Sequence, residues 1–243
     1  MTQFQAIHCE HEGTKLEGLV AWPAGAEEKG ARLPTVMVMH SANGLRHQVR
    51  GSIEKLAALG YLAIATDMYG PDIQNGEPVA SHQAYAAMHA RPGTVRSRAL
   101  AWLEAVRAHP GVDPARLAAI GYCFGGHCVL ELARAGADLQ AVVSYHGTLQ
   151  THAPAEAGVP KCEVVAYCGA QDPFAPMADI DALRQEMIDA GARYQITVFG
   201  EAAHSFTDPD AAVMGMEGIR YDRMAHQMSW AGTLTLLELL LGQ

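Results

Sequence analysis

The stretch Gly121-Tyr122-Cys123-Phe124-Gly125-Gly126 follows directly on the apolar run 117–120, and helix-forming residues 129–134 come soon after it. It has the Gly-x-nucleophile-x-Gly pattern of a sharp strand-to-helix turn, with the sulfur of Cys123 in the place of a serine oxygen. Such a turn strains its central residue and tolerates only small residues two positions to either side, where Gly121 and Gly125 stand. The pattern predicts that Cys123 lies near a helix N-terminus, whose free N–H groups favour a thiolate and a developing oxyanion.

The same motif has a purely structural interpretation. Short motifs recur by chance, and Cys123 would then be a small buried residue beside glycines that let a helix and a strand pack closely. The motif alone does not separate these two interpretations, so the rest of the chain must decide between them.

Length and composition favour one globular unit. The 243 residues, 49% hydrophobic and 18% charged, suit a single α/β domain spanning residues 1–243 with a sizeable core. Lys and Arg number 17 against 26 Asp and Glu, and the resulting formal charge of −9 argues against nucleic acid or an anionic membrane as a partner. A small-molecule substrate fits this composition better.

The cellular compartment is predicted from the N-terminus and the cysteines. Residues 1–8 lack a basic start followed by an apolar stretch, and no 18-residue uncharged apolar run occurs, so neither secretion nor membrane spanning is expected. The odd number of cysteines, without paired metal-ligand spacing, favours neither a disulfide framework nor a metal site. We therefore expect a cytoplasmic protein without metal or cofactor, with free thiols at Cys9, Cys123, Cys128, Cys162 and Cys168.

Strands and helices are expected to alternate along the chain. Apolar runs predict strands at 16–22, 35–39, 61–66, 117–120, 141–144, 163–167 and 194–199. Helical spacing and end signals predict helices at 53–59, 79–88, 95–108, from the elbow to 133, 177–190 and 221–241, with loops at 23–34 and 71–78. The pattern predicts a mostly parallel sheet covered on both faces, with ligands bound beyond the carboxyl ends of its strands.

Two further polar residues fall at that edge of the predicted sheet. Asp172 follows the strand 163–167, and His204 follows the strand 194–199. Singly, Asp172 could start a turn with Pro173, and His204 is one of 12 histidines. Together with the elbow, the order nucleophile, acid, histidine is that of α/β-hydrolases.

The chemistry of a catalytic triad needs these residue types. His204 would take the thiol proton of Cys123 or hold it as an ion pair, and Asp172 would orient the imidazole. The thiolate would attack a carbonyl carbon, and water would resolve the acyl-enzyme. The oxyanion hole would be formed by the backbone N–H groups of Phe124 and Ala42.

With those residues in hand, the chain resembles the dienelactone hydrolase family, an α/β-hydrolase branch with a cysteine nucleophile. The resemblance runs through nearly the whole chain. It implies a compact, metal-free hydrolase, monomeric or weakly dimeric, without a large cap domain, in which Ser41, Tyr85, Tyr145 and Phe206 contact a small ester or lactone. It rests on Gly60-Tyr61, Asp67-Met68-Tyr69-Gly70, the elbow, Tyr145-His146-Gly147, Gly169-Ala170-Gln171-Asp172 and Ala203-His204-Ser205-Phe206.

The chain departs from the family at three positions. Two arginines that bind the substrate carboxylate in muconate-pathway members are replaced here by Ser81 and Asp208, and Asp208 would repel such a group. We therefore expect neutral esters or lactones to be better substrates, unless Arg46, Arg50, Arg91 or Arg96 supplies an anchor from another direction.

Ser41 stands where the family usually has a glutamate, which is thought to keep the resting cysteine from being a permanent thiolate. With a neutral hydroxyl at this position, we expect Cys123 to rest as a thiolate paired with protonated His204.

Other features favour structural roles. Cys128 is expected to be a packing residue, His40 a satisfied buried histidine beside the oxyanion loop, and Asp67 a turn-fixing residue.

Other functions remain open from the sequence alone. The same triad would serve an acyltransferase or a peptidase, and a non-catalytic relative would use Cys123 to bind a ligand or to sense oxidants.

Overall fold

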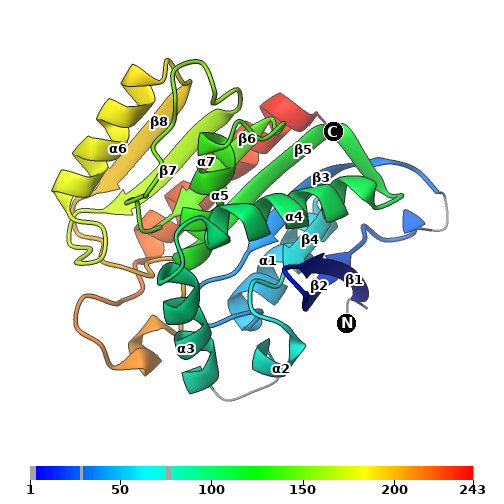
Figure 1. Cartoon of the computed structure of the whole chain (residues 1–243), viewed down its shortest axis with the longest axis horizontal. Helices are drawn as coiled ribbons and strands as arrows, with labels where there is room; N and C mark the ends of the chain where they lie inside the picture. Colours follow the sequence, from blue (N-terminus) through cyan, green and yellow to red (C-terminus); the bar gives the residue numbers. More distant parts are fainter. Residues whose placement is uncertain (1–3, 28–29, 75–77, 243) are drawn as a thin grey trace.

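An eight-stranded, mostly parallel sheet organises the molecule. The computed structural model describes residues 4–27, 30–74 and 78–242. The strand order is β1-β2-β4-β3-β5-β6-β7-β8, in which β1 and β2 are antiparallel to their neighbours and the other six run parallel (Figure 1). The strands are β1 Gln5–His11, β2 Thr14–Ala21, β3 Leu33–Met39, β4 Leu62–Thr66, β5 Val112–Tyr122, β6 Ala141–Tyr145, β7 Glu163–Gly169 and β8 Tyr194–Phe199.

Helices cover both faces of this sheet. The helices α4 and α5 pack on one face, and α1 and α7 pack on the other (Figure 1). The helices are α1 His47–Ala58, α2 Pro71–Gln74, α3 Pro78–His89, α4 Thr94–Ala108, α5 Phe124–Arg134, α6 Met177–Asp189 and α7 Arg223–Leu241, with a 3-10 helix at Ala211–Met214. The doubly covered parallel sheet explains why the central strands are apolar throughout.

The hydrophobic core is split by the sheet into two clusters. The cluster on the α4 and α5 face includes Trp102, Phe124 and Met187, and the cluster on the α1 and α7 face includes Ile53, Tyr145 and Leu237. Alternate residues of each strand supply the two clusters, since successive side chains of a strand point to opposite faces. The site beyond the strand ends is therefore built on a rigid layer.

The expected order of strands and helices is confirmed, and three elements were missed. The strand β1 lies at the edge of the sheet and buries only Ile7 fully, so its apolar signal is weak. The short helix α2 lies inside the loop expected at 71–78, of which residues 75–77 are outside the described residues. The third missed element is the 3-10 helix at Ala211–Met214.

The longest helix, α7, has 19 residues. Among the described residues, no helix combines the length and the apolar character that crossing a membrane requires.

Candidate active site

The predicted elbow is present at the end of β5. Cys123 follows the strand directly and is the N-cap residue of α5, with φ 53° and ψ −112°. This conformation is strained for a residue with a side chain. A Cβ atom on Gly121 would lie 2.0 Å from the carbonyl oxygen of Gly125, and one on Gly125 would lie 2.1 Å from that of Met39. Glycine is therefore required at both flanking positions.

Asp172 and His204 meet beyond the ends of β7 and β8. The His204 Nδ1 lies 2.8 Å from Asp172 Oδ2, and both side chains are buried, at 5% and 1% exposure. The other carboxylate oxygen of Asp172 accepts the backbone N–H of Phe174 at 2.8 Å. The backbone of His204 is itself held by an isolated parallel β-bridge to Ile219. Because Asp172 engages Nδ1, the imidazole Nε2 is the nitrogen that remains to contact Cys123.

Cys123 and His204 perturb each other's protonation. Partial burial raises the pKa of the Cys123 thiol, but the charge and the hydrogen bond of His204, with the N–H groups of Ala42 and Phe124, lower that pKa by more. For His204, burial lowers the pKa, while the charge of Cys123 and the hydrogen bond to Asp172 outweigh it and raise the pKa to about 10. Both directions favour an ion pair of thiolate and imidazolium.

The loop after β3 is shaped by His40. This buried histidine contacts the Ser41 carbonyl through Nδ1 at 2.6 Å and the Met68 backbone N–H through Nε2 at 2.9 Å. Since Nε2 must accept from Met68, the imidazole is neutral and Nδ1 donates, and burial indeed lowers the pKa of His40. The loop thereby presents the Ala42 N–H to the sulfur. The sequence-based view of His40 as a satisfied buried residue is confirmed.

Asp67 and Cys128 also have the structural roles expected of them. The Asp67 carboxylate accepts the backbone N–H groups of Tyr69 and Gly70 and so fixes the turn after β4. Cys128 is fully buried, and burial raises the pKa of its thiol.

Two members of the predicted triad line a cavity of about 240 Å³, which we call the inner cavity. Its wall includes Cys123 and His204 together with the expected Ser41, Ala42 and Tyr85. Gln48, His82, Thr148, Phe174 and Met216 also line it, and the sequence analysis did not single them out. Phe174 had the clearest signal, because it follows Asp172 by two residues.

A larger cavity of about 560 Å³ adjoins the inner one. The two cavities share Tyr85, Thr148 and Phe174, but the larger one contains no member of the predicted triad. We place the chemistry in the inner cavity for that reason.

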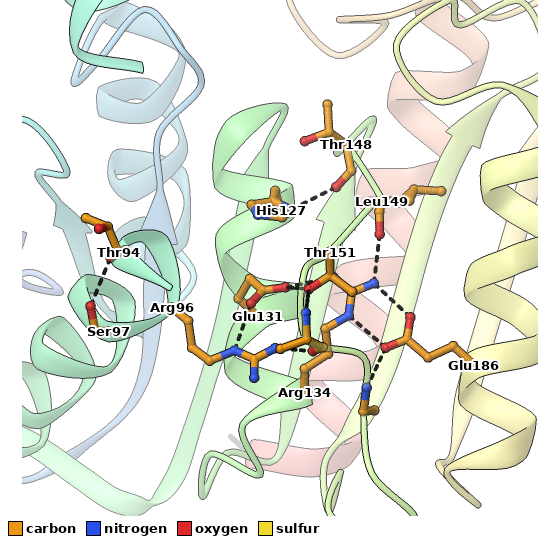
Figure 2. Close-up of polar contacts among 12 residues, drawn as sticks. Thr94, Arg96, Ser97, His127, Glu131, Arg134, Thr148, Leu149, Thr151 and Glu186 are labelled. Atoms are coloured by element: carbon orange, nitrogen blue, oxygen red, sulfur yellow. Dashed lines mark hydrogen bonds and ion pairs between the residues drawn. The ribbon is translucent and has the colours of Figure 1, made fainter. Parts of the chain in front are cut away.

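A buried ion-pair network forms part of the wall of the larger cavity, which Arg96, Glu131 and Thr151 line. Figure 2 shows its contacts. Arg134, whose side chain is 1% exposed, donates to Glu131, to both carboxylate oxygens of Glu186 and to the Leu149 carbonyl oxygen. Glu131 also accepts from Arg96 at 2.8 Å and from the Thr151 hydroxyl at 2.7 Å (Figure 2). The network fixes the loop after β6, which carries Thr148 into the cavity wall.

Two expected substrate contacts are not at the cavity, and the structure corrects their assignment. Tyr145 is buried on the α7 face, where its ring stacks between Tyr122 and Tyr167 and its hydroxyl bonds Thr233 at 2.5 Å. Phe206 is also fully buried, against His146 and Phe199. Both side chains belong to the core cluster on the α1 and α7 face of the sheet.

None of the four alternative arginines lines the inner cavity. Arg91 pairs with Glu12 and Arg96 with Glu131, while Arg50 donates to the Leu45 carbonyl oxygen. Arg46 lines a neighbouring cavity, and its Nε donates to the Asn43 carbonyl oxygen. Arg91 and Arg96 line the larger cavity, and no arginine is among the described residues that line the inner one.

The two positions where those anchors are replaced differ in their surroundings. Ser81 is fully buried and does not line the inner cavity, whereas Asp208 lines it. Asp208 lies 3.4 Å from His47, which lies 3.1 Å from Asp210. Ligand atoms of these three side chains lie within 4.8 Å of one another, but His47 and Asp210 are largely exposed, and we assign no metal to the group.

The fold and this geometry define a protein of the α/β-hydrolase class with cysteine at the nucleophile position. The family model for dienelactone hydrolases matches residues 16–241, so the chain belongs to the dienelactone hydrolase family. It is accordingly an ester-bond hydrolase.

The chain is also similar to curated relatives and to solved structures. The uncharacterized protein K02A2.1 of Caenorhabditis elegans is 36% identical over 154 residues, covering 61% of this chain and 95% of that protein. A putative carboxymethylenebutenolidase of Escherichia coli (strain K12) is 27% identical over 202 residues, covering 78% and 73%. Among structures, m3DLH has 34% identity and a TM-score of 0.89, and the dienelactone hydrolase-like promiscuous phosphotriesterase P91 from metagenomic libraries has 35% and 0.87, each covering 98% of both chains.

Proposed function

We propose that the protein hydrolyses a small carboxylic ester or lactone through Cys123, His204 and Asp172 and a covalent acyl-enzyme. The observation that carries the proposal is the sequence of contacts from the Asp172 carboxylate through the His204 imidazole to the Cys123 sulfur. It is supported by two backbone N–H groups at the same sulfur and by the family to which the chain belongs.

In the first half of the reaction, the Cys123 thiolate attacks the carbonyl carbon and a C–S bond forms. The carbonyl π electrons move to oxygen, and the N–H groups of Ala42 and Phe124 stabilise the oxyanion. As the tetrahedral intermediate collapses, the C–O bond to the alcohol breaks, and the leaving oxygen takes the proton from His204 Nε2. A thioester with Cys123 and a neutral His204 remain.

In the second half, water resolves the thioester. Neutral His204 takes a proton from the water while the oxygen attacks the acyl carbon, and the C–S bond breaks to release the acid and the thiolate. The Asp172 carboxylate stabilises the imidazolium each time it forms. The site thereby returns to its resting ion pair.

The test is p-nitrophenyl acetate turnover by the wild type beside Cys123→Ala and His204→Ala. We expect both variants to lose turnover while their circular dichroism matches that of the wild type. Residual turnover equal to that of the wild type would remove Cys123 as the nucleophile and favour the ligand-binding or sensing alternative. Product formation that depends on an added alcohol or amine would instead favour an acyltransferase, and cleavage of amide bonds a peptidase.

The substrate is proposed to lack a carboxylate. Asp208 lines the inner cavity, and no Arg or Lys does so within the described structure. We expect the catalytic efficiency on a neutral ester to exceed that on a matched carboxylate-bearing dienelactone. The opposite order would contradict this part of the proposal.

A further inference from the structure

The inner cavity has an unusual charge balance. Apart from the Cys123–His204 pair, whose charges cancel, Asp208 is the one described lining residue that carries a full charge. Its side chain is only 11% exposed, so bulk water screens it poorly. The wall that faces the substrate is therefore net negative.

One of the cavities that adjoin the inner cavity also has more acidic than basic charged side chains in its wall. An adjoining cavity of about 490 Å³ shares Asp208 and five other residues with the inner one. Asp210 and His47 line it, and Arg46 is the one arginine among its described lining residues. Two carboxylates and one guanidinium therefore line this adjoining cavity. A cation that enters through this adjoining cavity meets a favourable potential, whereas the larger cavity is lined by Arg91, Arg96 and Glu131.

The remaining wall suits an ammonium group. Tyr85 and Phe174 expose aromatic rings to the inner cavity, and Met216 adds a polarizable side chain. Aromatic faces beside a carboxylate are a common way to bind quaternary ammonium ions. Neutral polar side chains such as Asn43, Gln48 and Thr148 complete the wall, and its described lining residues include no Arg or Lys that would pair with an anionic group.

We propose that the inner cavity selects esters that carry a cationic ammonium group, with Asp208 as the residue that determines this specificity. The inference rests on the proposed esterase function and specifies its substrate class. It concerns binding next to the reacting carbonyl and leaves the chemical steps unchanged.

The experiment compares choline with its uncharged carbon isostere, 3,3-dimethylbutan-1-ol, as inhibitors of p-nitrophenyl acetate hydrolysis by the wild type. The assay runs at pH 8, where an ordinary histidine is neutral, and at constant ionic strength. We expect the inhibition constant of choline to be lower than that of the isostere by about fivefold or more, and the ratio to shrink as salt rises. Equal constants, or no inhibition by choline, overturn the proposal.

Two variants test whether Asp208 is the residue that causes the preference for choline. Asp208→Asn keeps the shape and the acceptor for the Asp210 backbone N–H while removing the charge, and we expect the two constants to become equal within about twofold. Asp181→Asn changes the net charge equally at an exposed position on α6 and should keep the wild-type ratio. A choline preference that persists in Asp208→Asn overturns the assignment to Asp208.

The same assay distinguishes a failure of the esterase proposal from a failure of the cation proposal. If the wild type does not hydrolyse p-nitrophenyl acetate at all, the esterase proposal fails first. If it hydrolyses that ester but shows no preference for choline, only the cation proposal fails. The wild-type comparison decides this even if Asp208→Asn does not fold.

Discussion

Replacing Arg134 with methionine tests whether the buried ion-pair network holds the loop behind the catalytic site. Methionine keeps much of the aliphatic length and removes the guanidinium. Glu131 would keep Arg96 and Thr151, but Glu186, whose side chain is 13% exposed, would keep the Ala155 backbone N–H as its remaining partner in the described structure (Figure 2). The substitution therefore leaves a buried carboxylate without its counter-ion.

The magnitude follows from that uncompensated charge. Removing one partner of a buried pair costs about 3–5 kcal/mol. The entropy of unfolding is about 2.1 cal/mol/K per residue, or about 0.5 kcal/mol/K for a chain of this length, so Tm should fall by about 6–10 °C. The Arg134 hydrogen bond to the Leu149 carbonyl oxygen, at 2.7 Å, is lost as well.

Thermal unfolding followed by circular dichroism measures this change. Arg184→Met is the matched control, because Arg184 forms an exposed pair with Asp181 on the same helix that carries Glu186, and we expect a shift of about 1 °C or less. Adding Glu186→Met to Arg134→Met should restore part of the loss, since no carboxylate is then left unpaired. A Tm shift for Arg134→Met no larger than that of the control would refute the reasoning.

Two further predictions concern protonation. Iodoacetamide should modify Cys123, identified by mass spectrometry, with a pH midpoint below the ordinary thiol value of about 8.5. In His204→Gln the midpoint should rise, because burial is then opposed only by the N–H groups of Ala42 and Phe124. A wild-type midpoint near 8.5 would contradict the resting ion pair. Stability should fall on acidification, because burial lowers the pKa of His40 and His146, and that of His127 to about 4, while an unfolded histidine titrates near 6.5. Between these values the unfolded chain binds more protons, so the free energy of unfolding rises with pH, and His127 alone accounts for about 2 kcal/mol between pH 5 and 7. A urea midpoint that does not change between pH 7 and pH 5 would show that these histidines are not held neutral.

The elements that position the candidate site could be predicted because their signals are local. The elbow needs glycine at fixed offsets from Cys123, and Asp172 and His204 each follow an apolar strand at once. Parallel strands bring such positions to one edge of the sheet without any knowledge of distant contacts. The resemblance to a known family added the roles of these residues.

The cavity wall was harder to predict, because it combines segments that are distant in sequence. Gln48, His82 and Met216 lie on three separate segments, and only the packing of the chain brings them together. Tyr145 was misassigned for a different reason. It shares strand parity with Val143, and both side chains lie in the cluster on the α7 face. The two-residue period of strand β6 contained the signal that would have excluded Tyr145 from the cavity.

In the proposed reaction, the replacement at Ser41 affects the cysteine, whereas the replacement at Asp208 affects the substrate. At Ser41 the neutral hydroxyl removes a negative charge that the family usually places near the resting cysteine, and this favours the thiolate. At Asp208 a carboxylate replaces an arginine in the wall that meets the substrate. In the proposed reaction the first replacement favours the charged form of Cys123, and the second disfavours an anionic substrate. In the proposed resting state the thiolate and His204 form a neutral pair, so Asp208 sets the charge that the cavity wall favours in a substrate, and that charge is positive.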